Sequence, residues 1–243
     1  MAAFSNQIAV ITGASSGVGR AIALSLAKEE ASLCLVGRNL NSLDVVAKCA
    51  RATAPYAHSY QTDLTQDKDI HELGARLKDH FGHIDLLIHS AGVIARGPFE
   101  TLPVEEFDWQ YRTNVRGPFL VTQTLLSLLK PCHGQIVFIN SVVGLTGKAP
   151  LGGQYAATKH ALKAFADNLR EEVGLDAVRV LSVYLGRTAT PMQAALHGIE
   201  GRAYHPERLV QPEDVAAIVI AALSLPRTAE VTDISIRPMP KPS

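Results

Sequence analysis

The sequence predicts an α/β protein in which a doubly wound parallel sheet of about seven strands carries helices on both faces. Short apolar runs rich in β-branched residues alternate with longer segments of helical periodicity through the first two thirds of the chain. Such nearly continuous apolar runs are typical of strands that are buried on both faces. No linker rich in Pro, Gly or Ser and no internal repeat interrupts the pattern, so we expect a single domain over residues 1–243.

Each expected strand is a short apolar run that ends at small or polar residues. In order, these runs cover residues 7–12, 32–37, 57–63, 84–92, 134–141, 178–186 and 230–238. Helices are expected between them, because apolar residues there recur at helical spacing. They cover residues 19–31, 39–53, 65–82, 104–130, 153–174 and 212–223. The second of these helices is opened by Asn39 or Asn41, both of which are good N-cap residues.

The least patterned region is the segment 187–211, "RTATPMQAALHGIEGRAYHPERLVQ". It follows the carboxyl end of a strand, which is where doubly wound sheets bind their ligands. We interpret it as a mobile flap over a site, and a plain surface excursion is the alternative.

Charge and composition narrow the classes of function. The chain has 23 basic and 23 acidic residues and a pI near 7.1, and 47% of its residues are hydrophobic. Nucleic-acid-binding proteins and proteins bound to anionic membranes usually have a basic excess, so we expect neither partner. The longest apolar stretch near the end, "VAAIVIAALSL", is too short to span a bilayer.

The N-terminus and the cysteines favour a cytoplasmic protein. The opening "MAAFSNQIAVITG" lacks the basic region and long apolar stretch of a signal peptide. Cys34, Cys49 and Cys132 are widely spaced, so we expect no disulfide and no metal site.

A glycine-rich turn follows the first strand, in the segment "VITGASSGVGRAIA" (10–23). Gly13, Gly17 and Gly19 would allow a tight turn and a close approach of phosphate oxygens to the backbone. The free N–H groups and the dipole of the following helix favour an anion there. In this strand-then-helix setting the turn indicates a dinucleotide site; a plain turn is the alternative.

The end of the second strand indicates which dinucleotide would bind. A carboxylate at this position usually holds the ribose 2′-hydroxyl of NAD(H), but the sequence here reads "LVGRN". Arg38 would pair bidentately with the 2′-phosphate of NADP(H), and Ser15 or Ser16 would add hydroxyl donors. We therefore expect NADP(H) to be preferred over NAD(H); a solvated arginine is the alternative.

A tyrosine and a lysine lie one helical turn apart in "GGQYAATKHAL" (152–162). On a helix, Tyr155 and Lys159 would share a face, and a nearby cation lowers the pKa of a phenol. Taken alone, the pair also fits an ordinary helix start with a solvated lysine.

Six motifs, in order and at family spacing, make the whole chain resemble the short-chain dehydrogenase/reductase (SDR) family. They are "TGASSGVG" (12–19), "TDL" (62–64), "SAG" (90–92), "TNVRG" (113–117), "INS" (139–141) and "YAATK" (155–159). The resemblance implies a single NAD(P)-binding Rossmann-fold catalytic domain. It also implies an NADP(H)-dependent oxidoreductase that transfers hydride between nicotinamide and the carbonyl or secondary alcohol of a small molecule.

The resemblance implies a role for each of four catalytic residues. Tyr155 would protonate the substrate oxygen, which at neutral pH requires its pKa of about 10 to fall by about 3. Lys159 and the oxidised nicotinamide are the cations that would lower it, and Ser141 would hold the substrate oxygen. Asn114 would keep a water in line with Lys159 for proton relay.

The resemblance also implies the remaining cofactor contacts. Asp63 and Leu64 would contact adenine, and Ala91 and Gly92 would lie beside the adenosine ribose. Further cofactor contacts are expected at Lys159 on the ribose, at Thr188 and Thr190 on the carboxamide, and at Val18, Ser90, Tyr155 and Gly186.

Two departures from the family pattern bear on the site. His89 and Ser90 stand where the family has two asparagines, and we interpret His89 as a hydrogen-bonded core residue. Tyr184-Leu185-Gly186 replaces Asn-Pro-Gly, and losing the proline relaxes φ where the backbone meets the nicotinamide amide. Tyr184 would either line the substrate pocket or pack in the core.

The substrate is less well indicated. The chain does not end its last strand in the Gly-Gly segment common among reductases of carrier-bound acyl chains, and it resembles more the branch acting on small polar hydroxy compounds. Arg96 would either pair a substrate carboxylate or be solvated. The expected substrate-pocket residues are Val93, Ile94, Arg96, Val143, Leu151, Met192 and Leu196.

Other functions stay open at this point. A 3-oxoacyl-carrier reductase, a non-catalytic NADP-binding sensor or scaffold, and an epimerase or dehydratase on a nucleotide sugar are the alternatives. The helices at 104–130 and 153–174 are apolar on more than one face, so we expect a homodimer or homotetramer built on them.

Overall fold

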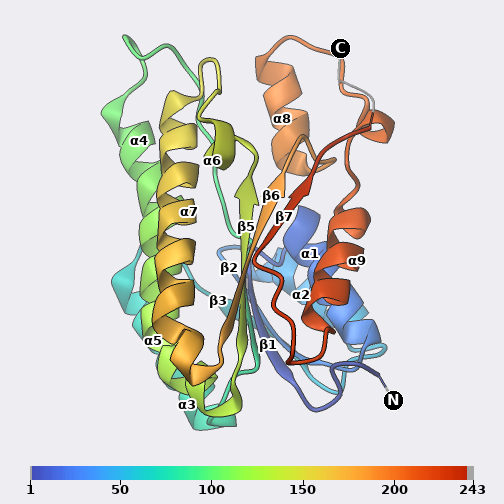
Figure 1. The fold of residues 1–243 in the computed structure, drawn as a ribbon. Coiled ribbons are helices and arrows are strands. Elements are labelled where there is room, and N and C mark those ends of the chain that lie inside the picture. The colour runs from blue at the N-terminus through green and yellow to red at the C-terminus, as the bar shows by residue number, and fades with distance from the viewer. Residues whose placement is uncertain (1, 240–243) are drawn as a thin grey trace.

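The computed structural model describes residues 2–239, and its centre is a parallel sheet of seven strands (Figure 1). The strand order is β3-β2-β1-β4-β5-β6-β7, so the chain reverses direction across the sheet between β1 and β4. The strands are β1 (Ile8–Thr12), β2 (Ser32–Gly37), β3 (Ala57–Gln61), β4 (Leu86–His89), β5 (Gln135–Ser141), β6 (Arg179–Leu185) and β7 (Asp233–Ile236). The predicted doubly wound sheet is therefore confirmed.

Helices cover both faces of the sheet and enclose two apolar cores. On one face lie α1 (Gly17–Lys28), α2 (Leu40–Ala50) and α9 (Pro212–Leu223). On the other lie α3 (Asp67–Phe81), α5 (Gly117–Leu129) and α7 (Gly153–Val173). The apolar strand residues alternate between the two cores, as in Ile11 and Val10 of β1, which explains why the strands are continuous apolar runs.

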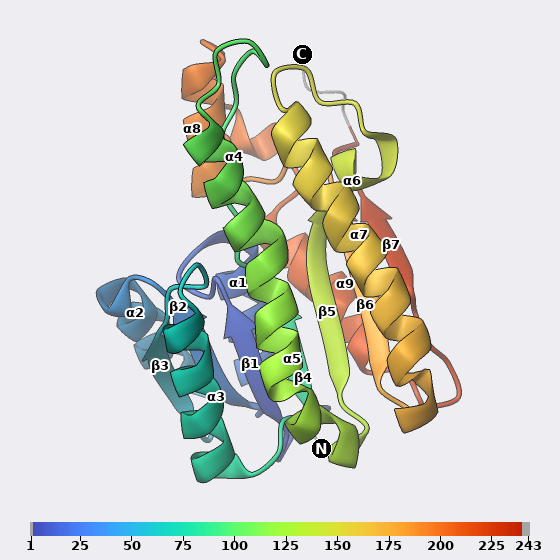
Figure 2. The ribbon, with the colours of Figure 1, turned by 90° about the vertical axis from the view of Figure 1, so that its left-hand side faces the viewer.

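The long helix expected at 104–130 contains an irregular turn. It consists of α4 (Val104–Tyr111), the π-turn η1 (Arg112–Arg116) and α5, which follow one another directly (Figure 2). The apolar periodicity spans all three, so it does not reveal the π-turn. Such turns are frequent at functional sites, and this one carries Asn114.

Two helices were not expected from the sequence. The four-residue α6 (Val143–Thr146) follows β5, and α8 (Pro191–Ile199) lies inside the segment 187–211. The hydroxyl of Thr190 caps α8 by accepting a hydrogen bond from the Gln193 N–H at 3.2 Å. The segment 187–211 thus contains a capped helix and the 3-10 turn η4 (Pro206–Arg208), and its mobility stays a prediction. The other 3-10 turns, η2 (Lys130–Cys132) and η3 (Gly174–Asp176), lie outside this segment.

Two local features of the fold follow from the sequence. Asn39, one of the two expected caps, accepts a hydrogen bond from the Ser42 N–H at 2.9 Å and opens α2. The strand expected at 84–92 ends at His89, because the N–H groups of Ser90 and Ala91 turn to the Thr12 hydroxyl.

Within residues 2–239 we find no helix that combines the length and apolar character needed to cross a bilayer.

Candidate active site

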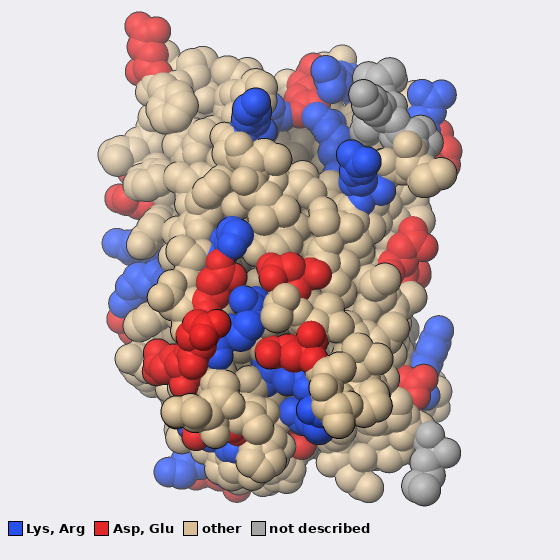
Figure 3. Space-filling view, in the orientation of Figure 1, with Lys and Arg blue, Asp and Glu red and all other residues tan. Residues whose placement is uncertain are grey.

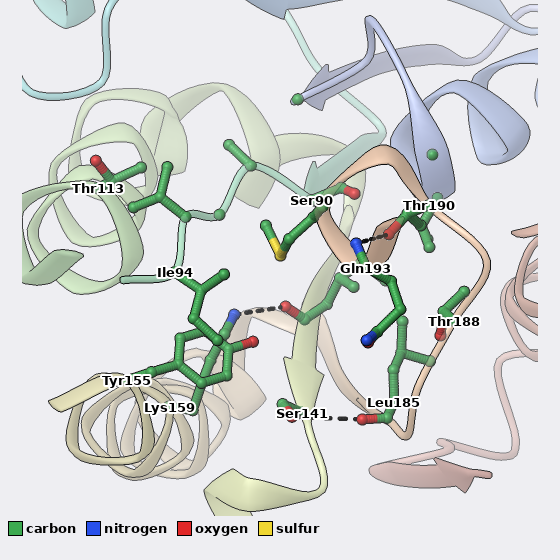
Figure 4. A pocket seen from close by; sticks show the side chains of 18 of the residues that line it. Ser90, Ile94, Thr113, Ser141, Tyr155, Lys159, Leu185, Thr188, Thr190 and Gln193 are labelled. Carbon is green, nitrogen blue, oxygen red and sulfur yellow. Dashed lines mark hydrogen bonds between the residues drawn. The ribbon is translucent and has the colours of Figure 1, made fainter. Parts of the chain in front are cut away.

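A cavity of about 620 Å³ lies at the carboxyl ends of the strands, where the sheet reverses its order. Two predicted cofactor or catalytic residues, Gly19 and Asn114, do not line it. The other predicted residues do, and they come from segments far apart in sequence: Gly13, Ser15, Ser16, Gly17, Val18, Arg38, Asp63, Leu64, Ser90, Ala91, Gly92, Ser141, Tyr155, Lys159, Gly186, Thr188 and Thr190. Figure 4 labels six of them: Ser90, Ser141, Tyr155, Lys159, Thr188 and Thr190.

The glycine-rich turn lies against the neighbouring strand end so closely that side chains would not fit. A Cβ on Gly13, whose φ is +67°, would stand 2.7 Å from the backbone of Ala91. Gly17 has a φ of +53°, and a Cβ there would stand 3.0 Å from Thr190. Helix α1 begins at Gly17 without a side-chain cap and without an acidic residue in its first turn. Its free N–H groups therefore suit an anion such as a dinucleotide pyrophosphate.

Gly19 has a packing role rather than a lining role. A Cβ on Gly19 would stand 2.4 Å from the carbonyl oxygen of Gly13, closer than any real contact. The third glycine of the motif therefore lets α1 approach the turn that precedes it.

The end of β2 presents a positive charge and no carboxylate to the cavity. Arg38 follows Gly37, is exposed, and makes no ion pair with another described residue. Its backbone carbonyl accepts a hydrogen bond from the Gln61 side chain at 3.1 Å, which ties this corner to β3. The arginine is thus available to an anionic ligand group.

Tyr155 and Lys159 lie on one face of α7, one turn apart, and the Lys159 ammonium is 5.8 Å from the centre of the Tyr155 ring. Burial raises the pKa of Tyr155 to about 12, although the Ser141 hydroxyl partly opposes this shift. Burial also lowers the pKa of Lys159 to about 8. Lys159 Nζ donates a hydrogen bond to the Ile139 carbonyl at 3.2 Å, as Figure 4 shows.

The prediction that Lys159 and the oxidised nicotinamide together lower the Tyr155 pKa stays a prediction. In this structure desolvation disfavours the charged form of both groups, and Lys159 is not among the causes of the Tyr155 pKa shift. The cluster is here a neutral phenol beside a lysine whose pKa is about 8. A phenol in this form is ready to donate a proton.

Asn114 is fully buried on η1, behind the cavity wall. Its Oδ1 accepts the Val93 N–H at 2.8 Å, and its Nδ2 donates to the Val93 carbonyl at 2.9 Å and to Thr158 Oγ1 at 3.1 Å. The side chain therefore holds the segment after β4. A Cβ on Gly92 would lie 3.5 Å from Asn114 Oδ1 and 3.8 Å from Lys159 Nζ, which are ordinary contacts, so Gly92 lies directly beside both side chains.

His89, which stands where the family has an asparagine, is a buried core residue, as expected. Its ring stacks on Phe138 at 4.7 Å, and Nε2 is 2.9 Å from the Thr122 hydroxyl. Burial lowers the pKa of His89 to about 3, so the ring is neutral, and its Nδ1 has no partner among the described residues. His89 does not line the cavity.

Of the two roles that the sequence left open for Tyr184, the structure shows packing in the core. Tyr184 is 1% exposed and lies outside the cavity lining. Leu185 continues β6 and pairs with Ser141 and Ile236 in the sheet. Its backbone carbonyl accepts a hydrogen bond from the Ser141 hydroxyl at 3.4 Å. Without a proline, the strand thus keeps its ladder up to the cavity.

Most of the expected substrate-pocket residues line the cavity: Val93, Ile94, Arg96, Val143, Met192 and Leu196. Leu151 does not line the cavity, and the residue is 57% exposed. Its backbone carbonyl accepts a hydrogen bond from the Gly97 N–H at 2.8 Å. The sequence analysis missed Lys148, Arg187, Gln193 and Glu200. The last three lie in or beside the unexpected helix α8, so a helix assignment there would have revealed them. Residues 2–239 contain no cluster of three or more His, Cys, Asp or Glu suited to a metal ion.

Comparisons with known proteins define the class. The protein has a doubly wound sheet, and its glycine-rich turn shares one cavity with Ser141, Tyr155 and Lys159. This arrangement is typical of oxidoreductases that bind a dinucleotide. Residues 7–199 match the family model of the short chain dehydrogenases. An uncharacterized oxidoreductase of Staphylococcus epidermidis is 34% identical over 240 residues, covering 98% of this chain and 100% of that protein. This chain belongs to the short chain dehydrogenase family and is one of its oxidoreductases.

Solved structures agree over nearly the whole chain. An alcohol dehydrogenase of the archaeon Thermococcus sibiricus, complexed with 5-hydroxy-NADP, has a TM-score of 0.88 at 26% identity and covers 98% of this chain and 99% of its own. A short chain dehydrogenase of Shigella flexneri, complexed with NADP, has a TM-score of 0.88 at 27% identity, with coverages of 96% and 98%. Actinorhodin polyketide ketoreductase with NADPH has a TM-score of 0.86 at 27% identity, covering 95% of each chain.

Proposed function

We propose that this protein is an NADP(H)-dependent oxidoreductase that transfers hydride between the nicotinamide and the carbonyl or secondary alcohol of a small molecule. The observation that carries this proposal is that Ser141, Tyr155 and Lys159 share one cavity with the glycine-rich turn. Solved relatives bound to NADP or NADPH support the choice of cofactor.

The residues present fit that cofactor. The glycine turn packs so closely on its own surroundings that a Cβ would collide with Ala91, and the start of α1, which has no side-chain cap, offers N–H donors to a diphosphate. Arg38 would hold the 2′-phosphate through its guanidinium fork. Thr188 and Thr190 also line the cavity and would hold the carboxamide. When bound, the cofactor supplies or accepts the hydride.

The chain's own residues would then handle the proton. The Ser141 hydroxyl would donate a hydrogen bond to the substrate oxygen and orient it toward Tyr155. The Tyr155 phenol, neutral at pH 7, would give its proton to that oxygen. Lys159 would favour the resulting phenolate by its positive charge, and in the alcohol-oxidising direction the same phenol would take the proton back.

The proposed activity is tested by mixing the protein with NADPH and a panel of aldehydes and ketones and following the absorbance of the reduced cofactor. We expect turnover by the wild type and a loss of about 100-fold or more in Tyr155→Phe, because the proton donor is removed. NADPH binding, measured by fluorescence titration, should persist in the variant. Full turnover by Tyr155→Phe, or none by the wild type, contradicts the proposal and favours a cofactor-binding sensor.

We further propose that the protein forms a homodimer or homotetramer through α4, α5 and α7. Four large apolar side chains of α4 and α5 are exposed on this face: Val104, Phe107, Tyr111 and Phe119. Figure 2 looks onto these helices, which lie side by side along one side of the sheet. Contiguous exposed apolar surface of this kind typically marks an interface.

A further inference from the structure

Two arginines at the far end of the cavity from Arg38 converge on one carboxylate. Arg96, from the segment after β4, donates to Glu200 Oε1, and Arg187, from the segment after β6, donates to both Glu200 oxygens at 3.1 and 3.0 Å. Arg96, Arg187 and Glu200 all line the cavity. Arg202 approaches the same carboxylate at 3.6 Å but does not line the cavity.

This cluster lies beside the catalytic residues. Arg96 Nη2 donates to the Pro150 carbonyl at 2.6 Å. Arg96 Nε is 3.8 Å from the position of a Cβ on Gly152, and Gly152 is the N-cap of α7, three positions before Tyr155. The guanidinium group is therefore fixed against the segment that carries the proposed proton donor.

Positive charge exceeds negative charge in this part of the cavity. Among the described residues, the lining at this end contains Arg96, Arg187 and Lys148 but a single carboxylate, that of Glu200. Lys148 makes no ion pair with any other described residue. Figure 3 shows Lys and Arg side chains gathered around a hollow near the top of the molecule. Lys148 is exposed to water, but Arg96, Arg187 and Glu200 are partly buried and together carry a net positive charge that an anionic substrate group would balance.

We infer that Arg96 and Arg187 form a subsite for a carboxylate of the substrate, so that the enzyme acts on a small oxo acid or hydroxy acid. The inference rests on the proposed function and names its substrate class. The planar guanidinium forks match a carboxylate, and the chain's own Glu200 carboxylate already occupies them. The substrate carboxylate would join or displace Glu200, whose helix α8 belongs to the segment 187–211.

The test compares matched substrates that differ only in this charge. A panel of 2-oxo and 3-oxo acids is assayed with NADPH beside the methyl esters of the same acids, and kcat/KM is measured for each pair. We expect the wild type to prefer at least one acid over its ester by about 10- to 100-fold, the range for charge-assisted hydrogen bonds.

Variants locate the source of that preference. Arg96→Ala should raise KM for the acid about 10-fold or more, and by a larger factor than it raises KM for the ester, while NADPH binding measured by fluorescence titration shows that the variant is folded. Arg96→Lys keeps the charge but loses the fork and should recover part of the preference. Arg202→Ala is the matched control, because Arg202 approaches Glu200 but does not line the cavity.

A second readout needs no turnover. The NADP⁺-loaded protein is titrated calorimetrically with succinate and with its dimethyl ester, neither of which has a ketone; tighter binding of succinate that is lost in Arg96→Ala is expected. Equal or better use of the esters, or equal losses in Arg96→Ala and Arg202→Ala, overturns the subsite and makes the cluster a structural clamp for α8. If acids and esters are reduced equally well, the subsite is overturned but the proposed function stands. If no carbonyl compound oxidises NADPH, the proposed function itself is overturned.

Discussion

At the scale of single residues, burial decides the chemistry of the site. Tyr155 and Lys159 are both shifted toward their neutral forms, to pKa values of about 12 and about 8, because each loses water on folding. A phenolate at neutral pH would therefore need positive charge beyond that of Lys159. The oxidised nicotinamide is the cation that we propose for this purpose.

Arg38 carries the prediction of cofactor preference. Arg38→Asp should weaken NADPH binding by about 100-fold or more, because a guanidinium–phosphate pair is replaced by two like charges. NADH binding should change much less, since NADH has no 2′-phosphate. Fluorescence titration of both cofactors measures the ratio. Equal losses of affinity would show that Arg38 does not touch the phosphate.

His89 predicts a dependence of stability on pH. Its pKa is lowered to about 3 in the folded protein and is about 6.5 when unfolded, so between these values the unfolded state binds the extra proton. The stabilisation by the neutral ring is complete above pH 6.5 and is lost as pH falls toward 3, by at most about 1.4 kcal/mol per pH unit.

Urea unfolding of the wild type and of His89→Asn at pH 7.5, 6 and 5 measures this effect. Asparagine does not titrate, so the stability of the variant should fall less over this range. His71→Asn, at an exposed position of α3, is the control and should follow the wild type. Parallel curves for wild type and His89→Asn would contradict the prediction.

At the scale of elements, the site depends on how closely a helix approaches a strand end. Helix α1 can begin at Gly17 only because the preceding turn and the helix itself lack side chains at Gly13 and Gly19. The same closeness turns the N–H groups of α1 toward the cavity. The phosphate cradle is thus a property of strand, turn and helix together.

Gly19→Ala tests this packing. The added Cβ would meet the Gly13 carbonyl oxygen at 2.4 Å, a backbone atom that cannot swing away, so we expect destabilisation by about 1–3 kcal/mol and weaker NADPH binding. Gly174→Ala is the control, because its Cβ meets nothing within 4 Å and its φ is −59°. Thermal unfolding with and without NADPH gives both quantities. A Gly19→Ala variant as stable as Gly174→Ala would contradict the packing model.

At the scale of the whole molecule, a balanced charge and an exposed apolar face point to self-association. Net charge is zero, with 23 basic and 23 acidic residues, so no strong repulsion between copies opposes assembly. Phe119 of α5 is 47% exposed yet packs against Phe165 of α7, with ring centres 5.6 Å apart. The two helices therefore present one joint surface.

Phe119→Asp should dissociate the proposed oligomer, because it places a charge in the centre of an apolar interface. Light scattering at micromolar concentration should show a dimer or tetramer for the wild type and a smaller species for the variant. Val45→Asp, an exposed apolar position on α2, is the control and should leave the mass unchanged. A monomeric wild type would reject the oligomer.

Much of the fold and most of the site residues could be predicted from local pattern. The apolar runs predicted all seven strands because a parallel sheet buries both of its faces, and the glycine spacing predicted the turn before α1. Helix α8 escaped prediction because its buried residues, Gln193 and His197, are polar, although Thr190 at the N-cap and Pro191 at the first position are together a signal for a helix start. Periodicity of apolar residues cannot reveal a helix of that kind.

The sequence by itself determined the order of strands and helices, the family, and the residue types that line the carboxyl ends of the strands. Only the tertiary structure decided the charge states and the partnerships. It buried Lys159, partly desolvated Tyr155, turned Asn114 toward Val93, and brought Arg96 and Arg187 onto Glu200. The physical reason is that pKa values and ion pairs depend on desolvation and on distance in space, and neither quantity is written in the spacing of residues along the chain.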